Sequence, residues 1–132
     1  MGLDNGIVLK ASSIKNEQVK KMLAPYILEY SPDVMEFAYW RKCWGIRADI
    51  LNVLDTSEYP GNDGDFVLDI DLINEIIKIL KSYNRKNWAA CDSIWEWEEI
   101  RDRLKIQIKD LKVLIKALTI EPELAPYFYD SY

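Results

Sequence analysis

Six residues between positions 39 and 47 carry the side chains best suited to binding, and they are Tyr39, Trp40, Arg41, Lys42, Trp44 and Arg47. An arginine stacks on the face of a tryptophan and donates paired hydrogen bonds to a carboxylate or a phosphate. The group therefore suits a planar or anionic ligand, or the surface of a partner protein. The alternative interpretation is a tryptophan-rich core along which the cations extend to solvent.

Acidic residues offer a second kind of chemistry, the binding of Ca²⁺ or Mg²⁺ through oxygen ligands. The cluster that offers it consists of Asn62, Asp63, Asp65, Asp69 and Asp71. Its spacing does not match an EF-hand loop, because the required central glycine and the closing glutamate are missing. We interpret the cluster as a solvated loop followed by a helix cap, and we expect no metal-binding residue.

Another acidic cluster contains Asp92, Glu96, Glu98 and Glu99. Paired carboxylates act as acid and base in glycosidases, but no motif for a substrate accompanies these four. The chain has no histidine, which excludes histidine-activated nucleophiles, histidine-ligated zinc and histidine acid–base catalysis. Two cysteines, Cys43 and Cys91, cannot supply a four-thiolate metal site within one chain. The sequence thus favours a non-enzymatic protein with no catalytic residue and no cofactor.

The composition indicates a globular protein that folds without disulfides. Its 132 residues, 49% of them hydrophobic, predict a single domain over residues 1–132 with both cysteines reduced, in or near the core. The net charge of −5 disfavours nonspecific attraction to nucleic acid or to anionic lipid. We find no signal-peptide pattern and no apolar run of membrane-spanning length, so we expect a cytoplasmic protein without a membrane or nucleic-acid partner.

The binding residues must be positioned by the segment in which they lie, and its pattern predicts a helix over residues 33–54. Asp33 followed by Glu36 resembles a capping box at the start of a helix. The buried face of this helix would contain Phe37, Trp40, Cys43, Trp44, Arg47, Ile50, Leu51 and Leu54. Arg47 on a buried face requires a carboxylate partner or a route to solvent.

The remaining patterns predict helices over residues 12–24, 69–83 and 98–118, with the second of these as the central buried helix. They predict strands over residues 6–10 and 66–68 and an edge strand at 127–129, and they leave residues 94–97 open between a further strand and the entry to the last helix. We therefore expect an α+β fold in which three or four helices pack on a small, mostly antiparallel sheet. The last helix repeats Leu104, Ile108, Leu111, Ile115 and Leu118 in a coiled-coil-like spacing, which leaves either intrachain packing or a homodimer open.

Two short motifs carry a resemblance to a known group of proteins. They are Met1-Gly2-Leu3-Asp4 at the N-terminus and Tyr39-Trp40-Arg41-Lys42 in the middle of the chain. The chain resembles small uncharacterised proteins that bacteriophages and prophages encode. It differs from many of them at Asn5-Gly6 and in lacking a glycine- and phenylalanine-rich stretch before the last helix. The resemblance implies an origin and brings no activity.

Together these observations support a phage-type accessory protein that binds a host or phage protein in the host cytoplasm. The contact would involve the exposed aromatic and basic residues of the segment from Tyr39 to Arg47. The alternative is a small-molecule or nucleotide-binding protein, including a metal-assisted hydrolase that uses Asp or Glu. A decoy that mimics nucleic acid is disfavoured, because 17 basic residues are interspersed with the acidic ones.

Overall fold

The computed structural model describes residues 4–54, 66–88 and 95–131, and it confirms the α+β fold. Five strands form one antiparallel sheet in the order β2-β3-β1-β5-β4. They are β1 (Asp4–Lys10), β2 (Ile27–Leu28), β3 (Ser31–Arg41), β4 (Phe66–Val67) and β5 (Tyr127–Ser131). The α-helices are α1 (Glu17–Leu23), α2 (Trp44–Val53), α3 (Ile70–Ser82), α4 (Arg85–Trp88) and α5 (Trp97–Ile120), and two short 3₁₀ turns are η1 (Ala11–Ser13) and η2 (Ala24–Tyr26).

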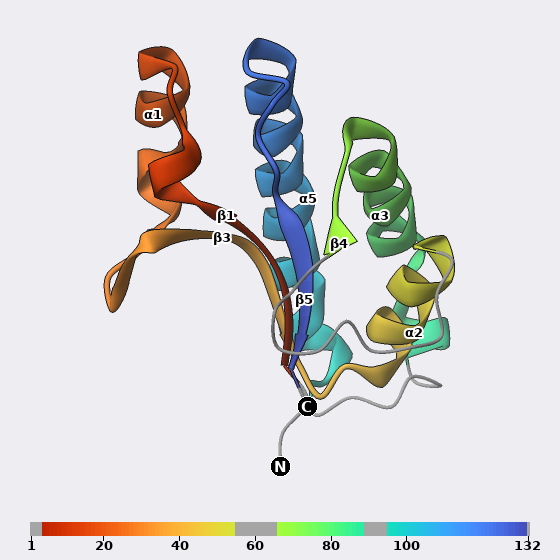
Figure 1. Cartoon of the computed structure of the whole chain (residues 1–132). Helices are drawn as coiled ribbons and strands as arrows, with labels where there is room; N and C mark the ends of the chain where they lie inside the picture. The colour runs from red at the N-terminus through yellow and green to blue at the C-terminus, as the bar shows by residue number, and fades with distance from the viewer. Residues whose placement is uncertain (1–3, 55–65, 89–94, 132) are drawn as a thin grey trace.

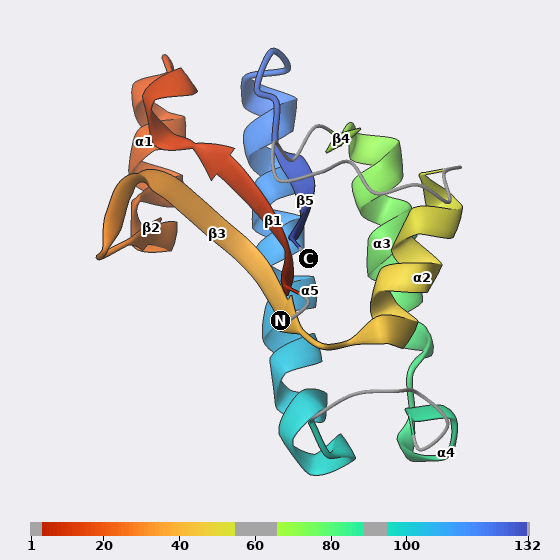
Figure 2. The same ribbon diagram turned by 60° about the horizontal axis from the view of Figure 1, so that its bottom comes forward.

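The long helix α5 is the axis of the helical layer. It crosses one face of the sheet behind β1 and β5, with α1 packed on one side and α3 on the other (Figures 1 and 2). Helix α2 lies beside α3. The sheet contributes Ile7, Leu9 and Phe128 to the core, and each of these side chains is at most 1% exposed. Burial of this apolar surface is the main force that holds the two layers together.

The central strand β1 requires a glycine where two neighbours approach it closely. Gly6 lies opposite Tyr39 of β3 and Tyr129 of β5. A Cβ atom at Gly6 would lie 2.6 Å from Cε1 of Tyr129 and 2.8 Å from the carbonyl oxygen of Ala38. The ring of Tyr129 therefore covers a position that has no room for a side chain.

The prediction of a helix over residues 33–54 is wrong for its first half, because residues 33–41 belong to β3. Strand β3 pairs with β1, and its register shifts so that Ala38 faces Ile7 while Glu36 faces Val8, which leaves Phe37 as an extra residue. This β-bulge turns Phe37 and Ala38 toward the core together. The resulting spacing of apolar residues resembles that of a helix. Only the pairing with β1 shows that the segment is a strand.

The turn between β3 and α2 contains one residue in the left-handed conformation. Lys42 has a φ angle of 51°, and the helix begins two positions later at Trp44. Few residues other than glycine adopt this conformation, so the turn stores some backbone strain. It redirects the chain from the sheet to the helical layer.

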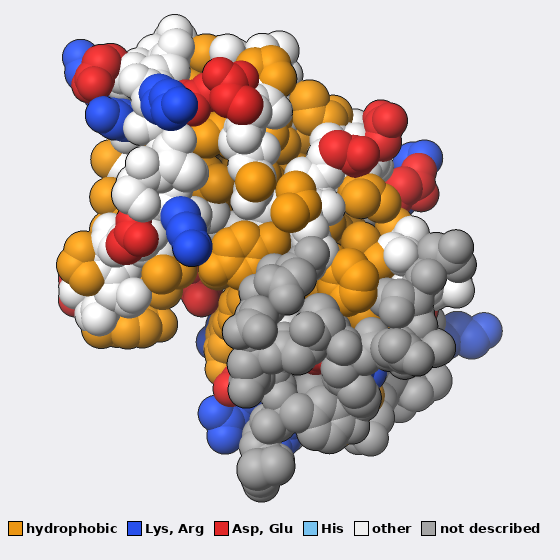
Figure 3. Space-filling model, viewed as in Figure 1, with side chains coloured by type: hydrophobic (Ala, Val, Ile, Leu, Met, Phe, Trp, Pro, Cys, Tyr) orange, Lys and Arg blue, Asp and Glu red, His pale blue; other side chains and the backbone are white. Residues whose placement is uncertain are grey.

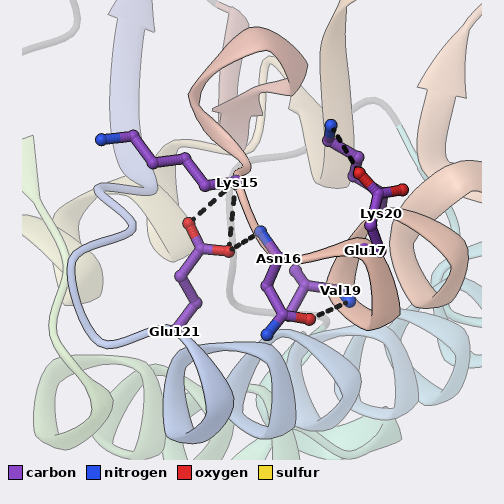
Figure 4. Close-up of polar contacts among 6 residues, drawn as sticks. All are labelled: Lys15, Asn16, Glu17, Val19, Lys20 and Glu121. Carbon is purple, nitrogen blue, oxygen red and sulfur yellow. Dashed lines mark hydrogen bonds and ion pairs between the residues drawn. The ribbon is translucent and has the colours of Figure 1, made fainter.

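The first helix begins later than the sequence predicts. Asn16, and not Ser12 or Ser13, is its N-cap, because the Oδ1 atom of Asn16 accepts the backbone N–H of Val19 at 3.1 Å. The carboxylate of Glu121, at the end of α5, accepts the backbone N–H groups of Lys15 at 3.1 Å and Asn16 at 2.9 Å (Figure 4). Glu121 is only 4% exposed, so one buried carboxylate joins the start of α1 to the end of α5.

Helix α3 matches its predicted boundaries but not its predicted central position. Asp69 caps it by accepting the backbone N–H of Leu72 at 2.8 Å. One face is buried, through Ile73, Ile76, Ile77 and Leu80, and the opposite face is exposed. The helix is therefore amphipathic and flanks α5.

The seam of α5 is shifted from the predicted one. Its buried stripe consists of Ile100, Leu104, Gln107, Leu111, Leu114, Ala117 and Leu118, while Ile108 and Ile115 are half-buried. This stripe packs within the chain.

Strand β5 also differs from prediction, because it lies between β1 and β4 and not at an edge. Residues 95 and 96 lead directly into α5, and the predicted loop at 56–65 lies outside the described residues.

We predict that Glu121→Ala lowers the free energy of unfolding by about 2 kcal/mol, because two partly buried backbone N–H groups lose the charged acceptor that joins α1 to α5. Glu121→Gln, which keeps one acceptor oxygen, should cost less. Chemical denaturation followed by circular dichroism measures both. The control is Glu123→Ala at a nearby exposed position, where we expect a change within about 0.5 kcal/mol. Equal effects of Glu121→Ala and Glu123→Ala would contradict this role.

Candidate functional site

The six predicted binding residues divide into a buried pair and an outward-facing set. Trp40 is fully buried and Arg47 is 8% exposed, so neither presents its side chain to a partner. The other four are Tyr39, Arg41, Lys42 and Trp44, which are half-buried or exposed. They do not share one helix face, since they extend from the end of β3 across the turn into α2.

The buried charge of Arg47 is neutralised by Asp130 of β5. The Nε atom of Arg47 donates to Oδ1 of Asp130 at 3.0 Å, and Nη2 donates to Oδ2 at 2.8 Å. The side chains are 9% and 0% exposed. The Nδ2 group of Asn5 also donates to Asp130, so the carboxylate joins α2, β1 and β5. The sequence left open whether Arg47 has a carboxylate partner or a route to solvent, and the structure shows the carboxylate partner, Asp130.

The buried indole of Trp40 is held by Gln107 of α5. Its Nε1–H group donates to Oε1 of Gln107 at 3.0 Å, and Nε2 of Gln107 donates to the backbone carbonyl of Tyr39 at 3.2 Å. Gln107 is 7% exposed. One side chain therefore satisfies two polar groups and attaches the end of β3 to α5. This is a structural role for Trp40.

Tyr39 and Arg41 meet on the opposite face of the sheet, at Asp4 of β1. The hydroxyl of Tyr39 donates to Oδ1 of Asp4 at 2.8 Å, and Nη1 of Arg41 lies 3.9 Å from the same oxygen. Burial and the neighbouring Asp4 raise the pKa of Tyr39. Burial, with Glu36 and Tyr39 nearby, raises the pKa of Tyr129. Both phenols are thus protonated at neutral pH and act as neutral hydrogen-bonding groups, not as nucleophiles.

Part of the outer edge of β3 has no neighbouring strand among the described residues. Strand β2 pairs with β3 only at Ser31 and Met35, which leaves residues 36–41 paired on the β1 side alone. A groove of about 260 Å³ runs beside this edge, between residues 36–39 and α5. Helix α5 contributes Arg103, Ile106, Gln107 and Asp110 to it.

Ile106 is the most exposed apolar side chain in this groove, at 60%. Asp110 accepts the hydroxyl of Tyr26 at 2.9 Å, and burial together with Asp110 raises the pKa of that tyrosine to about 12. The sequence analysis missed the contribution of α5. A usable signal was present, because Ile106 lies off the apolar seam of its own helix.

In the view of Figure 1 the sheet lies in front of α5, and the side chains on this face separate by type. Hydrophobic side chains gather along the middle of this face, and charged side chains lie mostly toward its margins (Figure 3). Mixed surfaces of this kind are common at interaction sites, which combine an apolar centre with a polar rim.

The acidic clusters do not assemble a metal site in the part of the chain that the structure describes. No group of three or more potential His, Cys, Asp or Glu ligands comes together there. Asp69 serves as a helix cap, and residues 62–65 and 92 lie outside the described ranges. Glu98 pairs with Arg85, and its own backbone N–H together with Arg85 lowers the pKa of Glu98. It is therefore an ionised surface group at neutral pH.

Within residues 4–54, 66–88 and 95–131, no helix combines the length and apolar character needed to cross a bilayer. A comparison with known protein families, with curated proteins and with solved structures finds no match. The function must therefore be inferred from the geometry of the chain itself.

We predict that Gln107→Leu lowers the free energy of unfolding by about 2 kcal/mol, because it leaves the buried N–H of Trp40 without an acceptor. Gln107→Glu keeps that acceptor but replaces the amide that donates to the carbonyl of Tyr39 with a buried carboxylate oxygen, so it should also lower the stability. Denaturant titration measures the loss, and the near-ultraviolet circular dichroism of tryptophan reports on the environment of the indole. A fully stable Gln107→Leu variant would show that the hydrogen bond is dispensable.

Proposed function

We propose that this chain is an accessory protein of phage or prophage type that acts in the host cytoplasm by binding a host or phage protein. Its two short motifs, Met1-Gly2-Leu3-Asp4 and Tyr39-Trp40-Arg41-Lys42, support the origin. Binding without catalysis is supported by the absence of histidine from the sequence and by phenols that are protonated at neutral pH.

The observation that carries the proposal is the incompletely paired edge of β3. The N–H and C=O groups of an edge strand form a template for an added strand, and many proteins recognise extended peptides in this way. Residues 36–41 extend beyond β2 and lie beside the groove against α5. We call residues 36–41 together with Arg103, Ile106 and Asp110 the β3-edge surface.

The composition of the β3-edge surface fits a protein partner. In the groove it combines an exposed apolar side chain, Ile106, with the cation Arg103 and the acids Glu36 and Asp110. Arg41 adds a second cation at the end of β3, on the other face of the sheet. An apolar anchor surrounded by both signs of charge is typical of a specific protein contact. A nucleic acid would require predominantly positive charge. An extended partner segment would pair with β3 and place an apolar side chain against Ile106.

Each of the six predicted binding residues has a place in this account. Tyr39 and Arg41 belong to the β3-edge surface, and Lys42 and Trp44 continue it around the turn into α2. Trp40 and Arg47 support it from inside, through their bonds to Gln107 and Asp130, as described above.

Affinity capture from a lysate of the infected or lysogenic host tests the proposal. We expect wild-type protein to enrich a partner, and we expect Ile106→Asp or Arg41→Glu to reduce its recovery about tenfold or more, because each places an unpaired charge in the contact. Quantitative mass spectrometry measures the recovery.

The matched control is Val67→Asp, which introduces the same charge at an apolar position of similar exposure, 58% against 60% for Ile106. Val67 lies on β4, at the other edge of the sheet. The control should recover the partner as the wild type does. Failure to enrich any partner, or equal recovery by all four proteins, would count against the proposal.

A further inference from the structure

A second groove lies on the other side of α5, between its first half and the end of α3, with a volume of about 340 Å³. Its floor is apolar, since Leu80 is 1% exposed and Leu104 is 3% exposed. Two half-buried aromatic side chains, Tyr83 of the chain after α3 and Trp97 at the start of α5, form its walls. A cleft with this lining is suited to a flat, apolar molecule.

The rim of the groove is positively charged. It carries Lys81, Arg101 and Lys105, and none of the described residues that line the groove is acidic. This contrasts with the net charge of −5 for the whole chain. The nearest carboxylate recorded at its wall is that of Asp49, which accepts the hydroxyl of Tyr83.

Arg101 contacts Asp102 at 3.4 Å, and its charge also helps to lower the pKa of Glu98. The side chains of Arg101 and Asp102 are 46% and 68% exposed, so water weakens that pair. Among the described residues, no carboxylate pairs with Lys81 or Lys105.

Arg101 and Lys105 stand one helical turn apart on the same face of α5, so their charged groups lie over the same part of the groove. Lys81 approaches from α3 on the other side. The three cations thus surround an apolar floor. Lysine and arginine side chains are long enough to reach an anionic group on a molecule that rests on that floor.

We propose that this groove binds a small aromatic anion, namely a flat aromatic body that carries a carboxylate, sulfonate or phosphate group. The aromatic body packs on Leu104 between Tyr83 and Trp97, and the anionic group lies among Lys81, Arg101 and Lys105. The volume of the groove is in the range of small-molecule sites. This site is separate from the β3-edge surface, which uses the opposite side of α5 through Arg103 and Ile106.

Two fluorescent probes that share an aromatic body separate the contributions of floor and rim. Anilinonaphthalene sulfonate carries an anionic group, and N-phenylnaphthylamine lacks it. We expect the sulfonate to bind with one-site saturation and to weaken as salt is added. Arg101→Gln and Lys105→Gln should each weaken it about fivefold, since each removes one charged donor, and should leave the affinity for the neutral probe unchanged.

The matched control is Lys116→Gln, which removes an exposed cation from α5 outside the groove and should leave both affinities unchanged. Circular dichroism and the melting temperature check that each variant retains the wild-type fold. The proposal is overturned if the sulfonate does not bind the wild type. It is also overturned if Arg101→Gln and Lys105→Gln leave the sulfonate affinity unchanged, or weaken both probes equally.

Discussion

The buried ion pair between Arg47 and Asp130 is the interaction on which the arrangement of the helices and the sheet depends. Removing two charges from water is costly, and here the cost is offset by short, paired contacts and by an added bond from Asn5. In the register of the sheet, Asn5 lies opposite both Trp40 and Asp130. One row of residues across β3, β1 and β5 thus carries the polar groups that hold two helices, since Trp40 binds Gln107 of α5 and Asp130 binds Arg47 of α2.

The buried contacts of Gln107 and Arg47 hold the outward-facing residues of β3 in place. Gln107 attaches the end of β3 to α5, and the left-handed turn at Lys42 leads the chain to α2, where Arg47 is held by Asp130. Between these attachments, residues 36–41 pair with β1 on one side and have no neighbouring strand on the other among the described residues. Helix α5 borders the groove at this edge and, on its other side, the second groove. A single long helix thereby separates two surfaces of different chemistry, one of mixed charge and one positively charged.

The sequence predicted those elements whose signals are local. The strand at residues 6–10, the cap at Asp69 and the long last helix all follow from nearby residues, and all are present. Residues 33–41 were misassigned because the bulge at Phe37 gives a strand the apolar spacing of a helix. Asp130 and Gln107 were missed because their partners lie 83 and 67 positions away, and no local pattern marks such a contact.

The role of the buried ion pair is tested most directly by a double-mutant cycle of unfolding free energies for Arg47→Met, Asp130→Leu and the double variant. Each single variant leaves one buried charge without its partner, so each should lose about 3 kcal/mol or more. The double variant leaves no such charge, and its loss should be smaller than the sum of the single losses by at least about 2 kcal/mol. Additive losses, or single variants as stable as the wild type, would contradict the account.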